Sequence, residues 1–281
     1  MTAASGLALN TATLGHNLDG AGAGWSPEQT IDACAERGLG GLVFWRREIA
    51  GREVALGERV RATGMAVVGL CRAPYLVGHE TPREPQAVMD GFMASIDAAA
   101  ALGAPVLTIV AGGIEPDTKG PATSLRRLEE RVAKGADYAA ARGVRLALEP
   151  LNPVYGANRS CLTSVRDAID ICARIGAPNV GVAVDVYHVW WDTDLARQLQ
   201  RPDCRIEGVH LCDWLHDTTD TLLDRGMMGD GVADIVGIRR AARDGGYTGI
   251  SEVEIFSART WWQRDPGLVL DTMIERFVSA C

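Results

Sequence analysis

Four side chains with metal-binding chemistry lie at the ends of short apolar runs in the second half of the sequence. Three are carboxylates and one is an imidazole, and each occupies the last position of its run or the position just before it. Hard oxygen ligands with one imidazole are typical of a divalent-cation site. Without a cation, like charges brought together in this way would repel one another. The four residues are Glu149, Asp185, His210 and Glu254.

The donor set also indicates which cation to expect. Carboxylate oxygens favour Mn²⁺ or Mg²⁺, and the single imidazole keeps Co²⁺ and Zn²⁺ as alternatives, so one Mn²⁺ ion is the first expectation. Small residues stand two positions before three of the ligands, at Ala147, Ala183 and Gly208. Because side chains alternate along a strand, they share the ligands' face and leave space beneath them.

One position is ambiguous, because Glu252 and Glu254 are two residues apart and point to the same face of their run. Glu254 is nearer the end of the run, so we predict it as the ligand.

The apolar runs alternate with amphipathic segments, and this cadence repeats eight times. A helix start is expected at Ser26-Pro27-Glu28, with serine as the N-cap and proline in the first turn. Several helices are expected to end at glycines, which supply the positive φ of many helix C-termini. The expected strands are 7–13, 41–45, 66–71, 105–111, 144–149, 180–185, 206–211 and 250–255.

Eight strand–helix units in this length indicate a single-domain (β/α)₈ TIM barrel, an α/β fold spanning residues 1–281. Its active site forms at the carboxyl ends of the strands, where the four ligands fall. The alternative is a doubly wound open sheet, but residues 13–17 do not match the GxGxxG phosphate loop.

Composition excludes several classes of protein. The 281-residue chain carries 28 basic and 36 acidic residues, so its overall field would repel nucleic acid. No apolar stretch approaches the roughly 20 residues that span a bilayer, and the N-terminal segment lacks signal-peptide features. The seven cysteines are scattered without CxxC spacing, which indicates reduced thiols. A cytoplasmic protein is therefore expected.

The stretch from Leu146 to Phe256 resembles the sugar phosphate isomerase/epimerase superfamily, the xylose isomerase-like TIM barrels. This group includes tagatose and psicose 3-epimerases and inosose isomerases. The resemblance places metal ligands on the same four residues, the last through the run Val253-Glu254-Ile255-Phe256. It implies that Glu149 and Glu254 exchange protons with the substrate. It also implies substrate contacts for His188 in Asp185-Val186-Tyr187-His188 and for Arg225 in the glycine-rich stretch 224–231.

Further substrate contacts follow from position alone. His16 and Trp45 come at or just after the ends of the runs 7–13 and 41–45 and are predicted to line the pocket, with core packing as the alternative for Trp45. Asn152, Tyr155 and Arg159 in the loop after 144–149 are further candidates. Because no Lys-rich pocket or Ser/Gly cradle is visible, an unphosphorylated substrate is expected.

The predicted activity is isomerisation or epimerisation of a keto-sugar or keto-cyclitol. A cation touching the carbonyl stabilises the enediolate formed when a carboxylate removes the neighbouring proton. Two glutamates on opposite faces of the substrate then remove and return that proton.

Other functions stay open on the same scaffold. The stretches 185–191 and 224–231 also resemble catalytic subunits of C-glycoside deglycosylases, which are lyases acting on 3-oxo-glycosides. An AP endonuclease-like hydrolase is disfavoured, because those enzymes need three zinc ions and more histidines than the five present here. A sugar-binding protein without turnover would be expected to lose one of the two glutamates. A homo-oligomer or a partner subunit is left open, with Trp261-Trp262 as a candidate contact.

Overall fold

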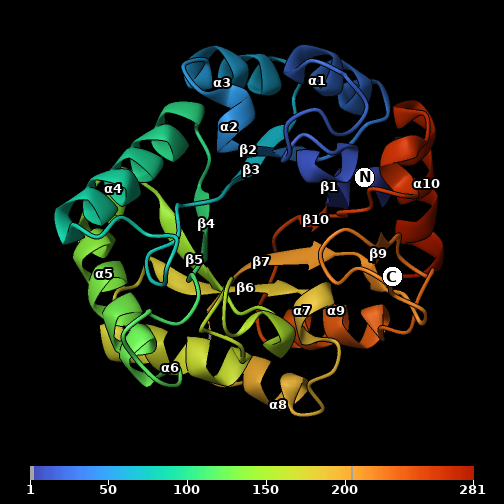
Figure 1. The fold of residues 1–281 in the computed structure, drawn as a ribbon. Helices are drawn as coiled ribbons and strands as arrows, with labels where there is room; N and C mark the ends of the chain where they lie inside the picture. Colours follow the sequence, from blue (N-terminus) through green and yellow to red (C-terminus); the bar gives the residue numbers. More distant parts are fainter. Residues whose placement is uncertain (1–2, 204) are drawn as a thin grey trace.

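Eight parallel strands close into a barrel that is surrounded by helices (Figure 1). The computed structural model describes residues 3–203 and 205–281. Residues 1 and 2 of the predicted domain and Cys204, one of the predicted reduced cysteines, lie outside the described residues. Cys34, Cys71, Cys161, Cys212 and Cys281 are free thiols, as expected for these five. The barrel strands are β1 (Leu7–Asn10), β2 (Gly41–Trp45), β3 (Ala66–Cys71), β4 (Val106–Val110), β5 (Arg145–Glu149), β6 (Val180–Asp185), β7 (Ile206–Leu211) and β10 (Ser251–Val253).

The order of strands around the barrel is β1-β10-β7-β6-β5-β4-β3-β2, which confirms the predicted TIM barrel. The register matters for the site, because it sets the predicted ligands side by side on neighbouring strands. Asp185 of β6 pairs with His210 of β7, and His210 pairs with Glu252 of β10. The pairing therefore collects these side chains at one rim of the barrel.

Helices connect the strands and cover the outside of the barrel (Figure 1). Ser26 caps the first of them, and its side chain forms a reciprocal capping box with Gln29, as the sequence indicated. Within the described residues, no helix has the length and apolar character needed to cross a membrane. The helices are α1 (Pro27–Glu36), α2 (Arg46–Ile49), α3 (Glu53–Ala62), α4 (Pro85–Leu102), α5 (Ala122–Ala140), α6 (Val165–Ile175), α7 (Val186–Val189), α8 (Leu195–Leu199), α9 (Ile235–Asp244) and α10 (Pro266–Ser279).

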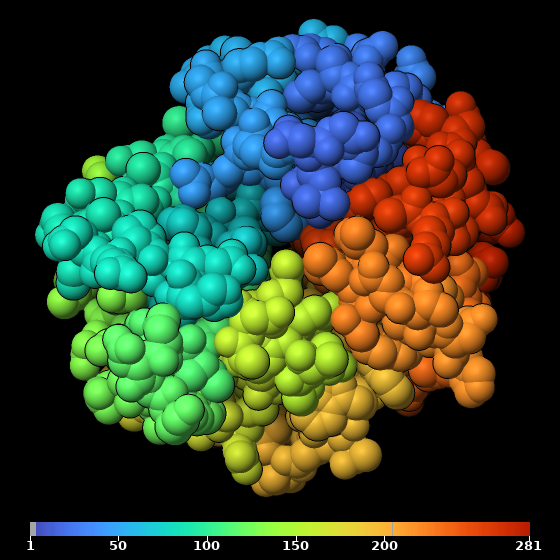
Figure 2. All heavy atoms as spheres, in the orientation of Figure 1, coloured from blue at the N-terminus to red at the C-terminus, as the bar shows by residue number. Residues whose placement is uncertain are grey.

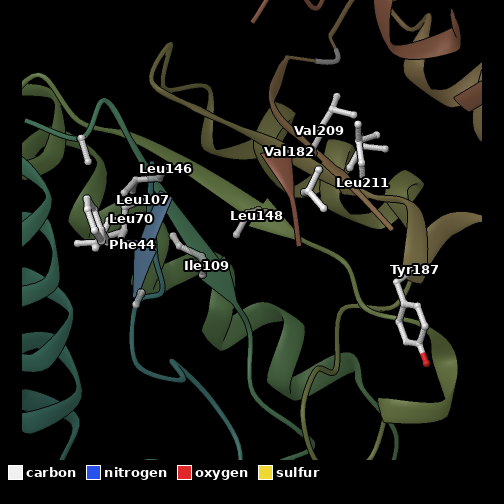
Figure 3. Close-up of a cluster of buried hydrophobic side chains, with 14 of the residues drawn as sticks. Phe44, Leu70, Leu107, Ile109, Leu146, Leu148, Val182, Tyr187, Val209 and Leu211 are labelled. Carbon is white, nitrogen blue, oxygen red and sulfur yellow. The ribbon is translucent and has the colours of Figure 1, made fainter. Parts of the chain in front are cut away.

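The apolar core lies mostly between the strands and the helices. Alternate strand residues, such as Leu146 and Leu148 of β5, belong to this outer core, and Figure 3 shows them with similar residues of β2 to β7. Inside the barrel, Val106, Ala147 and Ala183 form a separate small cluster. This inner layer of small side chains leaves room above it for polar residues at the rim.

Two strands are three residues shorter than the sequence predicted, whereas those expected at 105–111 and 144–149 are shorter by two residues and one. The run Leu7–Thr13 ends as a strand at Asn10, because the Asn10 side chain accepts a hydrogen bond from the Ala12 amide and starts a 3-10 turn, Thr11–Leu14. The run Ile250–Ile255 forms a strand only over Ser251–Val253. Glu254 therefore lies just beyond β10, at the rim.

A small hairpin follows β7 and carries part of the site. Strands β8 (Asp213–Trp214) and β9 (Arg225–Gly226) pair antiparallel, with Trp214 opposite Arg225. The buried Asp213 carboxylate accepts hydrogen bonds from four backbone amides, at distances of 2.8–3.0 Å. Three of these amides belong to the glycine-rich stretch that follows β9, so Asp213 fixes the loop around Arg225. The donors are Trp214, Gly229, Gly231 and Ala233.

Candidate metal centre and active site

The four predicted metal ligands form one buried cluster. Each offers a ligand atom within 4.8 Å of the others, and none of the four is more than 5% exposed. They come from the ends of four neighbouring strands, β5, β6, β7 and β10, as the barrel prediction required. The cluster consists of Glu149, Asp185, His210 and Glu254.

His210 presents one ring nitrogen to the cluster and the other to a supporting carboxylate. Its buried Nδ1 lies 2.9 Å from Glu149 Oε1 and 3.8 Å from Glu254 Oε2. Its Nε2 lies 3.4 Å from Glu252 Oε1. A ring nitrogen that faces the other candidate ligands, with a carboxylate at the second nitrogen, is the usual setting of a metal-ligating histidine.

The charge of the cluster also fits a divalent cation. Burial raises the pKa of Glu254 well above its ordinary value, and the neighbouring Glu149 carboxylate adds to this effect. Burial opposes protonation of His210, but Glu252, Glu149 and Glu254 outweigh it and raise the pKa of the imidazole. Both shifts report excess negative charge in a place without solvent, which a cation would relieve. The residues present therefore fit a divalent cation.

Glu252 and Glu254 take different places in the structure. Both accept hydrogen bonds from Asn10 Nδ2, at 3.0 and 3.1 Å, so one amide holds the two carboxylates. Glu254 groups with the other three candidate ligands, whereas Glu252 lies behind His210. Glu254 therefore stays the predicted ligand, and Glu252 lies in a supporting position, although it also groups with Cys71 and Glu254 in a second buried set.

Arg225 reaches the same cluster from β9. Its Nη1 donates to Asp185 Oδ2 at 2.9 Å and to Glu254 Oε2 at 3.3 Å. The guanidinium lies between the rings of Tyr187 and Phe256, 4.5 and 4.3 Å from their centroids. Burial would raise the pKa of Asp185, but Arg225 and other positive neighbours outweigh it and lower this pKa to about 2. Arg225 therefore keeps Asp185 ionised and balances part of the cluster's charge.

His188 is a buried neutral histidine beside the cluster. Burial lowers its pKa to about 4. Its Nδ1 accepts a hydrogen bond from the Asn152 amide at 3.2 Å, and its Nε2 lies 3.4 Å from Arg225 Nη2. These contacts fix the ring at the cavity wall.

A cavity lies above the cluster. On the face shown in Figure 2, the blue, cyan and yellow-green parts of the chain meet around a narrow dark gap near the centre. Of the residues predicted to act on substrate, Glu149, Glu254, His188, Arg225 and Trp45 line it. The Trp45 ring meets Phe256 edge to face, with centroids 5.7 Å apart. Of the further candidates in the loop after β5, Tyr155 and Arg159 also belong to the lining, and Asn152 does not. The remaining lining residues are Cys71, Arg72, Thr108, Val110, Leu151, Leu222 and Phe256.

The structure does not bring His16 to this cavity wall. The His16 Nδ1 lies 2.9 Å from Glu48 Oε2, and its ring is buried beside α2. Glu48 holds it there, because the same carboxylate also accepts the Trp45 amide at 2.9 Å. A direct substrate contact of His16 is therefore unsupported by the geometry.

Sequence reasoning missed two residues that organise the site. Asn10 links the cavity wall to the glutamates, since its Oδ1 accepts the Trp45 indole N–H at 2.9 Å while its Nδ2 serves Glu252 and Glu254. Ending the first strand at Asn10 would have placed this side chain at the rim. Asp213 is the other missed residue, and the nearby glycines at 226, 229 and 231 were its only signal.

Comparison with known proteins decides the family. A family model described as "Xylose isomerase-like TIM barrel" matches residues 31–273. The chain belongs to the xylose isomerase-like TIM barrel family. This membership confirms the resemblance found in the sequence. The members of the family are mostly metal-dependent sugar isomerases and epimerases.

Solved structures show the same fold over nearly the whole chain. Protein SMc04130 from Sinorhizobium meliloti 1021 is 40% identical, with 98% of each chain covered and a TM-score of 0.90. The IolI protein with a bound zinc atom is 16% identical, with 98% and 97% covered and a TM-score of 0.81. A D-psicose 3-epimerase studied with D-fructose is 17% identical, with 97% and 96% covered and a TM-score of 0.74. A comparison with curated proteins gives no match.

Proposed function

We propose that this xylose isomerase-like barrel is a divalent-metal-dependent isomerase or epimerase acting on a keto-sugar or keto-cyclitol. One observation carries the proposal. Of the five acidic or imidazole side chains of the centre, only Glu149 and Glu254 line the cavity, while Asp185, His210 and Glu252 lie behind them. The two carboxylates that can reach a substrate carbon are therefore the pair that proton transfer requires.

A divalent cation held by Glu149, Asp185, His210 and Glu254, with Mn²⁺ as our first choice, would supply positive charge beside the substrate carbonyl and so acidify the neighbouring C–H bond. Among its structural neighbours, IolI binds zinc and D-psicose 3-epimerase is named for the epimerisation of a ketose. These neighbours support the same metal and substrate classes here.

The protein's own groups divide the remaining work. Glu149 and Glu254 approach the cavity from β5 and from the end of β10, so one removes the proton beside the carbonyl and the other returns a proton. Asn10 and Arg225 hold Glu254 in place. His188 offers its ring to a hydroxyl, and Trp45 with Phe256 gives an apolar wall for C–H faces of the sugar.

The test is deuterium incorporation from D₂O into ketoses and keto-inositols by the Mn²⁺-loaded protein, followed by NMR. Glu149→Gln and Glu254→Gln are each expected to lower the exchange rate by roughly 10²–10⁴-fold, since each removes an acid–base group. Glu252→Gln is the matched control, because Glu252 lies outside the cavity lining, and a milder loss is expected. Metal content is measured for every variant, so that lost binding is separated from lost proton transfer.

Two outcomes would change the proposal. If Glu252→Gln lowers the exchange rate more than Glu254→Gln does, at equal metal content, then Glu252 and not Glu254 carries the proton transfer. Exchange into a 3-oxo-glycoside accompanied by release of its aglycone would replace isomerisation with elimination, which is the lyase alternative.

A further inference from the structure

Two arginines line the cavity without an acidic partner. Arg72 directly follows β3, and Arg159 lies in the loop after β5. The Arg72 Nη1 donates only to the carbonyl of its neighbour Ala73, at 3.1 Å. Within the described residues, neither guanidinium has a carboxylate oxygen within 4 Å, whereas Arg225 in the same cavity pairs with both Asp185 and Glu254.

The two guanidiniums are positioned by one aromatic platform. Arg72 lies over the Tyr75 ring, 4.1 Å from its centroid, and Arg159 lies 5.7 Å from the centroid of Tyr155. Tyr75 and Tyr155 belong to the same buried cluster, with Val110 and Leu151. Stacking on fixed rings limits the motion of long side chains that would otherwise extend into water.

Placing two unpaired cations here is unfavourable until an anion joins them. Burial lowers the pKa of Arg72, and the like charge of Arg159 lowers it further. Both side chains are only partly exposed. Desolvated charges that lack a partner cost free energy, which a bound anion would recover through charge-assisted hydrogen bonds.

The charges of the centre do not provide that anion. Glu149, Asp185, Glu252 and Glu254 carry four negative charges when ionised. Arg225 and a divalent cation supply three positive charges, so one negative charge remains. Arg72 and Arg159 then leave the cavity with a surplus of one positive charge. A substrate with one negative group would make the loaded site neutral.

We propose that Arg72 and Arg159 together bind an anionic group of the substrate, a carboxylate or a phosphate, at the end remote from the reacting carbonyl. The substrate is then an acidic derivative of a ketose, with its carbonyl end at Glu149 and Glu254 and its charged end at the arginine pair. This inference rests on the proposed function for the placement of the carbonyl end. It refines the sequence expectation of an unphosphorylated substrate, which considered lysines and Ser/Gly cradles only.

The test uses three compounds that share one ketose end and differ at the last carbon. These are D-fructose, D-fructuronate and D-fructose 6-phosphate, which end in a hydroxyl, a carboxylate and a phosphate. Their dissociation constants are measured by calorimetry on the Mn²⁺-loaded full chain, and deuterium exchange is recorded in parallel. At least one anionic compound is expected to bind about tenfold more tightly than fructose, and which one does so separates carboxylate from phosphate recognition.

Variants then assign the preference to the arginine pair. Arg72→Gln and Arg159→Gln are each expected to reduce the anion preference, which is the ratio of the affinity for the anionic compound to the affinity for fructose, about fivefold or more. Arg126→Gln is the matched control, because Arg126 is an exposed arginine of α5 whose loss changes net charge equally. This control is expected to leave the anion preference intact. The melting temperature and the metal content are expected to stay unchanged in all variants.

The results separate this inference from the proposed function. Anionic compounds that bind no better than fructose, or show no measurable binding, overturn the inference, as does a preference that survives in the double variant. Exchange into fructose without an anion preference leaves the proposed function standing alone. A preference that depends on the arginines, without exchange into any compound, supports anion binding and counts against the proposed proton transfer.

Discussion

Asp213 allows a sharp test of how the fold holds the active-site loop. Its carboxylate is about 1% exposed and accepts four backbone N–H bonds, two on each oxygen. Asp213→Asn keeps the shape but replaces one accepting oxygen with an NH₂ donor. Two backbone amides then face a donor and lose their bonds, in a place from which water is excluded.

The magnitude follows from those two lost bonds. A hydrogen bond to a charged group is worth roughly 1.5–3 kcal/mol, and an unsatisfied buried group costs a similar amount, so a loss of about 2–4 kcal/mol is expected after partial relaxation. For a chain of this size, that corresponds to a fall in melting temperature of roughly 5–12 °C. Because the loop carries Arg225, ligand affinity should fall as well.

Thermal unfolding followed by circular dichroism measures the effect. Asp234→Asn is the matched control, because Asp234 is an exposed N-cap of α9 that accepts one amide, and asparagine caps helices equally well. Its melting temperature should stay within about 1 °C of the wild type, since exposed substitutions of this kind are usually near neutral. Equal melting temperatures for Asp213→Asn and the wild type would refute the reasoning about this loop.

Three further predictions concern the metal centre. A Cβ atom added at Gly208 would lie 3.1 Å from His210 Nε2, so Gly208→Ala should weaken Mn²⁺ binding about tenfold in calorimetry. Gly69→Ala is the control, because its added Cβ would have ordinary contacts at 3.4 Å or more, and it should leave the affinity unchanged. Equal affinities for the two variants would contradict the tight packing behind His210. Mn²⁺ at a hundred times its Kd should stabilise the stripped protein by about 2.7 kcal/mol in urea unfolding, and Asp185→Asn should lose most of this gain; full stabilisation of that variant would remove Asp185 from the ligand set. Trp45→Phe removes the indole donor to Asn10 and should lower the unfolding free energy by about 1 kcal/mol. It should also lower the rate of deuterium exchange into the substrate. An unchanged rate would show that Asn10 positions the glutamates without Trp45.

The fold could be predicted from the sequence because its signals are local and repeat. Strand runs such as Gly41–Trp45 and Val180–Asp185 have the bounds the sequence indicated, and the parallel barrel follows from the alternation of strands and helices. Where a side chain competes for the backbone, local patterns fail. Asn10 ended its strand early in this way, because its side chain accepts the Ala12 amide and begins a 3-10 turn.

The candidate metal ligands could be found for a related reason. In a barrel, strand ends meet at one rim, so residues far apart in sequence, such as Glu149 and Glu254, are brought together by topology alone. Side chains that act through loops could not be found in this way. The position of His16 depends on Glu48 of α2, and the role of Asp213 depends on amides up to 20 residues away.

Only the three-dimensional structure reveals that Arg72 and Arg159 line the same cavity. The two residues lie on different loops, and their shared surroundings come from Tyr75 and Tyr155 packing in one cluster. In the proposed substrate site, loop residues would recognise the charge of the substrate, while residues at the strand ends would carry the chemistry. Such a division is expected in a barrel that supports many reactions on one scaffold.

The most direct test of the account is deuterium exchange by the wild-type protein with and without its cation. The protein is stripped with a chelator, divided, and one half is reloaded with Mn²⁺ before both are mixed in D₂O with the ketose, keto-inositol and acidic ketose compounds. The account predicts exchange at the carbon beside the carbonyl in the loaded half and background exchange in the stripped half. Exchange of equal rate in both halves, or bound Mn²⁺ without exchange into any compound, would contradict it.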